Sequence, residues 1–98
     1  MSQPRVALVI LNWNGRDDLL QCVASLPRLT YGNWQATVVD NHSSDDSLAA
    51  LARAFPEQRV LALDRNYGFT GGNNRGIADA LAHGADYVLL LNNDTEMH

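Results

Sequence analysis

The chain has 98 residues, of which 46% are hydrophobic and 18% charged, and its formal net charge at neutral pH is −4. These values are typical of one small folded domain and exclude a disordered, collagen-like or coiled-coil chain. The chain has no lysine, and its seven arginines form no run, which argues against a nucleic-acid-binding surface.

Short apolar runs alternate with segments of helical periodicity along the chain. The four apolar runs, each of which predicts a buried strand, are Val6 to Leu11, Ala36 to Val39, Val60 to Leu63 and Tyr87 to Leu91. Between them, apolar residues recur at helical spacing in segments that contain Leu19, Leu48 and Ile77. The predicted order of elements is β-α-β-α-β-α-β.

Capping and breaking residues set the limits of these helices. Ser44, followed by two aspartates, predicts a capped and acidic first turn of the second helix. Pro27 and Pro56 predict the ends of the first and second helices, and Gly84 predicts a left-handed cap after the third.

Strands that alternate with helices of this length pair in parallel through right-handed crossovers. We therefore predict an α/β fold with a Rossmann-like parallel sheet in the strand order 3-2-1-4. All strands then end at the same edge of the sheet, which brings Asn12, Asp40 and the segment Asn92 to Asp94 together. Ligands of such open sheets bind at that edge, where the strand order reverses.

The fourth strand would lie at an open edge of this sheet although it is apolar on both faces. Proteins avoid long apolar strands at open edges because such strands pair with other chains. We expect further strands to cover it in a longer protein, and we expect the 98-residue chain to self-associate there.

No segment of the sequence predicts targeting to a membrane or anchoring in one. The longest early apolar run, Val6 to Leu11, is too short for a signal peptide and far too short to span a bilayer. The single Cys22 favours a reducing compartment and is expected to pack on a helix. We expect a cytoplasmic protein. If it associates with a membrane, we expect it to do so at the inner face and through sequence outside these residues.

The polar segment after the first run is Asn12-Trp13-Asn14-Gly15. Asn and Gly tolerate unusual backbone angles, so a plain turn explains the segment about as well as a ligand site does. Trp13 is either an aromatic wall for a nucleobase or a side chain packed under the loop.

Asp40 comes directly after the second run, where no local turn requires a carboxylate. An acid at a strand end accepts hydrogen bonds from a ribose hydroxyl or a pyrimidine N–H, so we expect Asp40 to contact a ligand. The residues that follow need no ligand, since helix capping explains the serines and exposure in a loop explains His42.

The segment Asn66 to Gly76 after the third run is rich in glycine and asparagine. Glycines ahead of a helix let backbone N–H groups approach an anion. The spacing matches neither G-x-G-x-x-G nor a P-loop, which disfavours a dinucleotide-binding domain. Close packing of a helix on the sheet explains the glycines equally well.

The fourth run leads into Asn92-Asn93-Asp94-Thr95-Glu96. A carboxylate at the tip of a strand can hold Mg²⁺ or Mn²⁺ against a diphosphate, whose oxygens complete the ligand set. Asp94 is the candidate ligand and Glu96 a weaker one, while a plain polar turn is the alternative.

The chain resembles the nucleotide-binding half of family 2 glycosyltransferases, which are inverting enzymes with the GT-A fold, and its rhamnosyltransferase-like members in particular. Four segments carry the resemblance: VALVILNWNG, VVDNHSSDDS, NYGFTGGNNRGI and ADYVLLLNNDT. The resemblance extends from Arg5 to Thr95. It implies that residues 1–98 form the donor-binding part of a truncated GT-A domain, without the acceptor-binding half that contains the catalytic base.

The resemblance also implies roles for single residues. Asp40 would contact the nucleotide base, and Asp94 would bind the divalent metal. Asn92 stands where the family's D-x-D-type motif has its first aspartate, so an amide would contact the ribose. The other nucleotide-binding candidates are Asn12, Asn14, Asn66 and Asn74.

The implied function is transfer of a hexose from a UDP- or dTDP-sugar to a glycan or lipid-linked acceptor, for polysaccharide biosynthesis. We expect no transfer by the 98 residues alone. A sugar nucleotidyltransferase is one alternative, although the basic loop that it needs after the first strand is represented only by Arg16. A non-enzymatic flavodoxin-like module is the second alternative. Asp64 lies near the position of the phosphoacceptor aspartate in such a module, but the module also needs a lysine late in the sequence, and this chain has no lysine.

Overall fold

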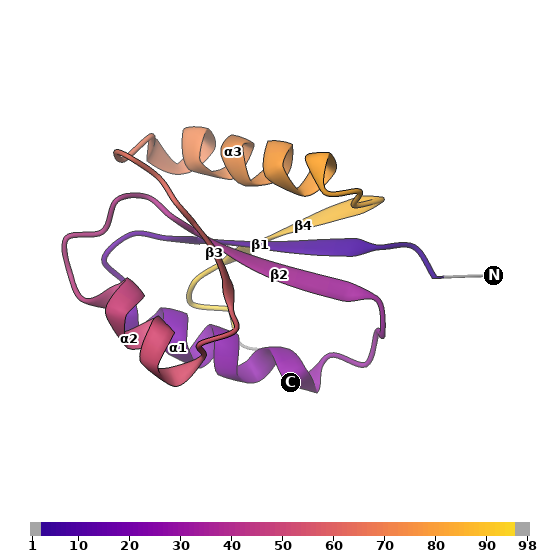
Figure 1. Cartoon of the computed structure of the whole chain (residues 1–98), viewed down its shortest axis with the longest axis horizontal. Helices are drawn as coiled ribbons and strands as arrows, with labels where there is room; N and C mark the ends of the chain where they lie inside the picture. Colours follow the sequence, from indigo (N-terminus) through magenta and orange to yellow (C-terminus); the bar gives the residue numbers. More distant parts are fainter. Residues whose placement is uncertain (1–2, 96–98) are drawn as a thin grey trace.

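The computed structural model describes residues 3–95, which form an α/β fold with a four-stranded parallel sheet (Figure 1). The strands are β1 (Val6–Asn12), β2 (Trp34–Asp40), β3 (Arg59–Ala62) and β4 (Tyr87–Asn92). The helices are α1 (Arg16–Ser25), η1 (Leu26–Arg28), α2 (Ser47–Ala54) and α3 (Gly68–Ala82). The strand order is β3-β2-β1-β4 and all pairs are parallel, which confirms the predicted fold class.

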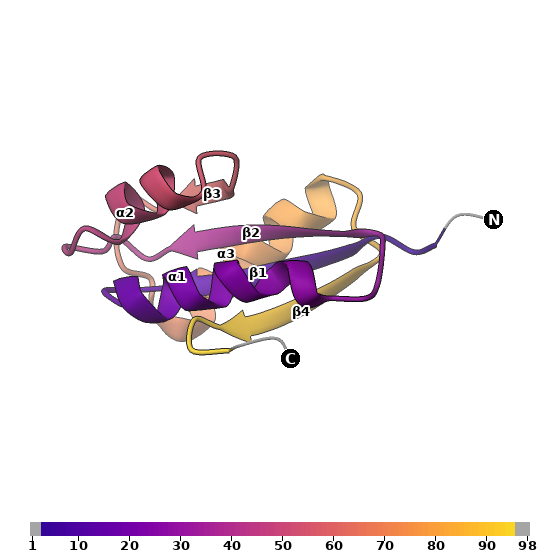
Figure 2. The same cartoon turned by 90° about the horizontal axis from the view of Figure 1, so that it is seen from below.

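The helices form a layer on each side of the sheet, with α1 and α2 on one face and α3 on the other (Figures 1 and 2). Leu8 and Ile10 of β1 pack in the layer under α1 and α2, whereas Val9 packs in the layer under α3. Because both faces are covered, the central strand β1 is apolar from Val6 to Leu11 rather than alternating. Cys22 of α1 is buried in the first layer, as expected.

The start of α2 differs from the prediction. Ser44 does not cap this helix, which begins at Ser47 and has no side-chain hydrogen bond from its capping residue. Instead, the Asp45 carboxylate accepts hydrogen bonds from the backbone N–H and hydroxyl of Ser47. The hydroxyl hydrogen bond is the main reason why the pKa of Asp45 is lowered.

The predicted helix ends agree with the structure in outline. Pro56 follows the end of α2, and Gly84 has a positive φ of 86° after α3, as predicted. Pro27 lies inside the 3₁₀ turn η1, so α1 itself ends two residues earlier, at Ser25. The proline therefore tightens the last turn rather than ending the helix at once.

The glycine-rich segment forms the first half of α3 and is not a loop before it. Gly72 and Gly76 face the sheet. A Cβ atom on Gly72 would lie 2.7 Å from Cδ1 of Leu11, and one on Gly76 would lie 2.5 Å from Cγ1 of Val9. Close packing of α3 on β1 is therefore what these two glycines permit.

Residues 3–95 contain no helix with the length and hydropathy that crossing a membrane requires.

Candidate functional site

A cleft lies at the edge of the sheet where β1, β2 and β4 end, at the left of Figure 1. The strand order reverses here, since β2 and β3 lie on one side of β1 and β4 on the other. The cleft has a volume of about 390 Å³, within the range of small-molecule sites. Its lining residues come from the ends of β1 and β4, the first turn of α3 and the neighbouring loops, and are Leu11, Trp13, Asn41, Asn66, Gly68, Phe69, Asn92, Asn93 and Asp94.

Asn12 joins the tips of three strands below this cleft. Its side chain is fully buried, and its Nδ2 donates to Oδ1 of Asp40 at 2.9 Å. Its Oδ1 accepts a hydrogen bond from Nδ2 of Asn93 at 2.9 Å. One amide therefore links the ends of β1 and β2 to the turn after β4, and neither of its polar atoms is left to face the cleft.

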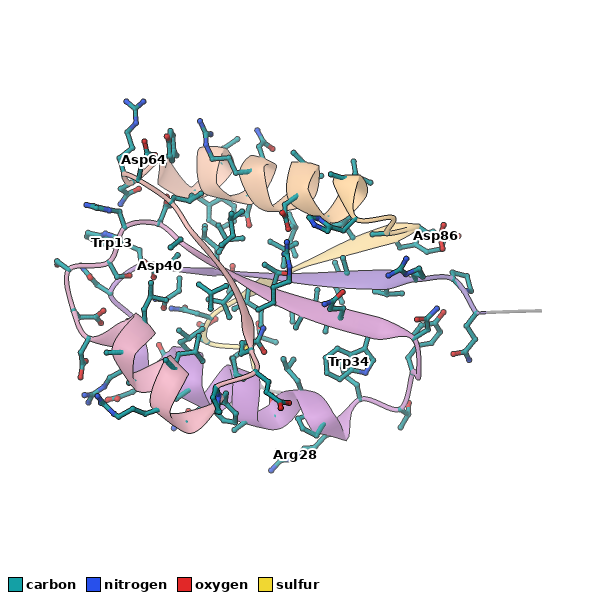
Figure 3. The ribbon with its side chains drawn as sticks, in the orientation of Figure 1. Trp13, Arg28, Trp34, Asp40, Asp64 and Asp86 are labelled. Atoms are coloured by element: carbon teal, nitrogen blue, oxygen red, sulfur yellow. The ribbon has the colours of Figure 1, made fainter. Side chains whose placement is uncertain are left out.

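Asp40 is 2% exposed and its carboxylate is occupied by hydrogen bonds from the protein (Figure 3). Besides Asn12, the backbone N–H of Ser43 donates to it at 2.9 Å and the Ser43 hydroxyl at 2.7 Å. The expectation that no local turn requires this carboxylate was therefore wrong, because Asp40 closes the turn to Ser43. Contact between Asp40 and a nucleotide stays a prediction.

Asn14 faces the loop after β2 and does not line the cleft. Its backbone has a positive φ of 52°. Its Oδ1 accepts hydrogen bonds from the backbone N–H of Ser44 at 2.7 Å and of Asp45 at 3.1 Å. These contacts hold the loops after β1 and β2 together at the rim.

Two exposed aromatic side chains line the cleft. Trp13 is 55% exposed at the end of β1, so it is not packed under its loop (Figure 3). Phe69, in the first turn of α3, is 65% exposed. Sequence reasoning missed Phe69, although a large apolar residue inside a glycine-rich segment was a signal for it.

Of the other predicted asparagines, Asn66 and Asn92 line the cleft, whereas Asn74 is exposed on α3 outside the lining. Sequence reasoning also missed Asn41, which is buried next to Asp40. Its Nδ2 donates to the carbonyl of Gly68 at 2.9 Å, and its Oδ1 accepts from the backbone N–H of Tyr67 at 2.9 Å. Asn41 thereby ties the loop after β2 to the start of α3.

A tight turn after β4 carries Asp94. The backbone N–H of Thr95 donates to the carbonyl of Asn92 at 3.0 Å, which closes the turn. A Cβ atom on Gly15 would lie 2.2 Å from Nδ2 of Asn93, so Asn93 can reach Asn12 only because Gly15 has no side chain. The turn is anchored by Asn93 and leaves the Asp94 side chain exposed at the cleft.

The donor atoms at the cleft suit one class of metal ion. Within residues 3–95, no three His, Cys, Asp or Glu side chains are grouped to hold a metal, and Glu96 lies outside the described residues. Asp94 thus offers one free carboxylate, with amide oxygens beside it. This set fits a hard divalent ion that takes its other ligands from water and phosphate, and it does not fit a structural zinc site.

Comparison with known proteins gives a family and a relative. The family described as Glycosyl transferase family 2 has a model that matches residues 7–98. The succinoglycan biosynthesis protein ExoO of Rhizobium meliloti (strain 1021) is 34% identical over 93 residues. The match covers 93% of this chain and 26% of ExoO, so the chain spans about a quarter of that relative's length.

Solved structures with the same fold include two from other organisms. The mannosyltransferase PcManGT from Pyrobaculum calidifontis, in complex with GDP-Man and Mn²⁺, has a TM-score of 0.74 at 18% identity. That match covers 97% of this chain and 29% of PcManGT. TarS of S. aureus has a TM-score of 0.76 at 20% identity, over 92% of this chain and 16% of TarS. At these identities the matches show the GT-A-like fold alone.

Proposed function

The chain belongs to glycosyl transferase family 2, and we propose that its 98 residues form the donor-binding part of a glycosyltransferase. The proposed reaction is transfer of a hexose, with inversion, from a UDP- or dTDP-sugar to a glycan or lipid-linked acceptor. We place the chain with the rhamnosyltransferase-like members, in polysaccharide biosynthesis, and the single cysteine supports a cytoplasmic location. Family membership favours this proposal over a sugar nucleotidyltransferase or a flavodoxin-like module.

The observation that carries the proposal is the cleft at the point where the strand order reverses. Its aromatic walls, Trp13 and Phe69, offer flat apolar surfaces to a nucleobase. Asn66 and Asn92 offer amides to ribose hydroxyls, and Asp94 offers a carboxylate to the metal ion of a metal-bound diphosphate. A nucleoside diphosphate presents a base, a ribose and a diphosphate, which these three kinds of side chain suit.

The remaining nucleotide-binding candidates do not line the cleft but lie below it or beside it. Asp40 and Asn12 are buried under the cleft, so Asp40 would reach a base only if Ser43 released it. We propose that both hold the rim in shape, as Asn14 does through its contacts with the loop after β2. Asn74 would take part only at the outer border of the donor pocket.

Asp94 is the proposed ligand for Mg²⁺ or Mn²⁺. Such an ion supplies positive charge that stabilises the departing diphosphate. The protein's own part is to hold the turn that carries Asp94, which it does through the hydrogen bond from Asn93 to Asn12. The Mn²⁺ named with PcManGT supports this assignment.

Calorimetric titration of the chain with UDP, dTDP and GDP, with and without Mn²⁺, tests the proposal. We expect binding that requires Mn²⁺ and that falls about tenfold or more in Asp94→Asn, because the substitution removes the charge and keeps the shape. Asp18→Asn is the matched control, since Asp18 is an exposed aspartate on α1, and it should bind as the wild type does. Binding that does not depend on Mn²⁺, or that is equally strong in Asp94→Asn and wild type, would show that the assignment of the metal site to Asp94 is wrong.

A further inference from the structure

The first turn of α3 carries part of the cleft but has a low intrinsic stability. Gly68 and Phe69 of this turn line the cleft. Four glycines lie between Gly68 and Gly76, and glycine disfavours a helix. Phe69 is 65% exposed, so burial in the core does not fix it. Asn41 holds the backbone where the helix begins, and a second contact is needed to hold the turn beyond it.

A stack of two side chains spans this turn. The guanidinium carbon of Arg75, about two turns further along α3, lies 3.4 Å from the centre of the Tyr67 ring. The Nη1 atom of Arg75 also donates to the carbonyl of Gly71 at 3.2 Å. A Cβ atom on Gly71 would lie 2.9 Å from Cβ of Tyr67, so this glycine leaves the room that the ring occupies. The stack therefore joins the capping residue of α3 to the turns that follow it.

The Tyr67 ring is also tied to the loop after β3. Its hydroxyl donates to Oδ1 of Asp64, and the guanidinium carbon of Arg65 lies 5.0 Å from the ring centre. The hydrogen bond from Tyr67 is the main reason why the pKa of Asp64 is lowered, and the charges of Arg65 and Arg75 lower it further. Figure 3 shows Asp64 at the same end of the molecule as Trp13 of the cleft. The stack thus connects the loop after β3 with α3 beside the donor site.

We propose that Tyr67 and Arg75 are positioning residues for nucleotide binding, because their stack holds the first turn of α3 in the conformation that presents Phe69 to the cleft. This inference rests on the proposed function. Neither Tyr67 nor Arg75 lines the cleft, so both act through the turn and not by contact with the donor. A cation that lies over an exposed aromatic ring changes an equilibrium by about two- to fivefold, which sets the size of the expected effects.

A positioning role differs from a general contribution to stability in what opens when the stack is lost. Gly76 and Ala80 of α3 are buried, and Cβ atoms of the sheet side chains leave no space for a larger residue at Gly76. The second half of the helix therefore stays packed on the sheet without the stack. We expect Arg75→Ala to open the first turn alone and to leave the denaturation midpoint almost unchanged.

Amide hydrogen exchange tests the stack without any ligand. In an α-helix the amides of residues 71–74 donate to the carbonyls of residues 67–70, so their protection reports on the first turn. Arg75→Ala should raise their exchange rates about two- to fivefold, although alanine is the better helix former, and it should leave residues 77–82 unchanged. Arg53→Ala, at an exposed position of α2, is the matched control and should change neither group. Unchanged rates in Arg75→Ala, or an equal rise along the whole helix, would overturn the proposal.

Calorimetric titration with UDP, dTDP and GDP in the presence of Mn²⁺ tests the connection to the donor site. Arg75→Ala and Tyr67→Leu should bind about two- to fivefold more weakly than the wild type, since a smaller fraction of molecules has the turn closed. Tyr67→Phe keeps the ring and loses only the hydroxyl, so it should bind more tightly than Tyr67→Leu. Adding Arg75→Ala to Tyr67→Leu should weaken binding little further, because the stack is already lost.

The two measurements separate failure of this inference from failure of the proposed function. Faster exchange of residues 71–74 with unchanged nucleotide binding would show that the stack holds the turn but does not serve the donor site. Equal binding by Tyr67→Phe and Tyr67→Leu would show that the ring face is not what matters. A wild type that binds none of the three nucleotides would contradict the proposed function, and the positioning role with it, whereas hydrogen exchange would still show whether the stack holds the turn.

Discussion

At the residue scale, the asparagines at the carboxyl edge of the sheet divide between two tasks. Asn12 and Asn41 are buried and use both the donor and the acceptor of their amides to join neighbouring loops. Asn66 and Asn92 are exposed and line the cleft. A buried amide can bridge a donor and an acceptor without the desolvation cost of a charge. This explains why a rim that is expected to receive an anion is built largely from neutral side chains.

The contact between Gly15 and Asn93 predicts a specific stability defect. Gly15→Ala would place a Cβ atom 2.2 Å from Nδ2 of Asn93, so Asn93 must leave Asn12 and the turn that carries Asp94 must shift. Loss of this buried hydrogen bond should lower the free energy of unfolding by about 1–2 kcal/mol. Denaturant unfolding of wild type and variant measures the difference.

A double-mutant cycle separates this contact from a general effect of alanine. In an Asn93→Ala background the amide that Gly15→Ala would strike is already gone, so the second substitution should cost much less there. Gly15 has a φ of −121°, which other residues adopt, so backbone strain does not complicate the comparison. Equal costs in the two backgrounds would mean that Gly15 is not needed to make room for Asn93.

The sequence placed the rim residues correctly but not the contacts of their side chains. The parallel order of the strands was enough to predict that Asn12, Asp40 and Asn92 to Asp94 share one edge. The burial of Asp40 was not predictable in the same way. It depends on the Ser43 hydroxyl and on Asn12, which lies 28 positions away, and no local pattern encodes that pairing.

At the element scale, α3 shows where tertiary packing overrides local propensity. Glycine disfavours a helix by about 1 kcal/mol per residue, so a segment with four glycines between Gly68 and Gly76 looked like a loop. Two of these glycines let the helix approach β1 and β2 closely, and the burial gained there offsets the low propensity. The sequence could suggest close packing as an alternative, but only the fold shows which glycines face the sheet.

Gly76→Ala should destabilise the chain although alanine is the better helix former. The new Cβ atom would lie 2.5 Å from Val9 Cγ1 and 2.9 Å from Val39 Cγ2, and both valines are buried. Forcing α3 away from the sheet should cost about 1–3 kcal/mol, which outweighs the gain in propensity. Denaturant unfolding measures the cost. Asn74→Ala, at an exposed position of the same helix, is the control and should be neutral or slightly stabilising.

At the scale of the whole molecule, the two edges of the sheet are built differently. The edge where the strands end carries the cleft and its neutral amides. At the opposite edge, where the strands begin, an ion pair joins β3 to α3. Arg59 Nη2 donates to Oδ1 of Asp79 at 3.0 Å, and Arg59 Nη1 donates to the hydroxyl of Thr37 on β2 at 2.9 Å. Three elements are thus tied together far from the donor site, so stability can be altered there without touching the cleft.

This ion pair gives the chain a defined dependence on acid. The hydrogen bond from Arg59 is the main reason why the pKa of Asp79 lies below its usual value, and the charges of Arg59 and His83 lower it further. A carboxyl group with a lowered pKa in the folded state stabilises the fold fully above its unfolded pKa, near 3.8. That stabilisation is lost as the pH falls through the lower, folded value.

Asp79→Asn should therefore lower the free energy of unfolding by about 1–2 kcal/mol near neutral pH, since Asp79 is only partly exposed and its charge is paired. The difference between wild type and variant should be present above about pH 5, and it should shrink below about pH 4, where Asp79 becomes protonated first in the unfolded and then in the folded wild type. Denaturant unfolding at a series of pH values measures it. Asp18→Asn, at an exposed position of α1, should show little difference from the wild type at neutral pH. A gap between wild type and Asp79→Asn that stays the same at the lowest pH would mean that packing of the side chain, rather than its charge, holds β3 to α3.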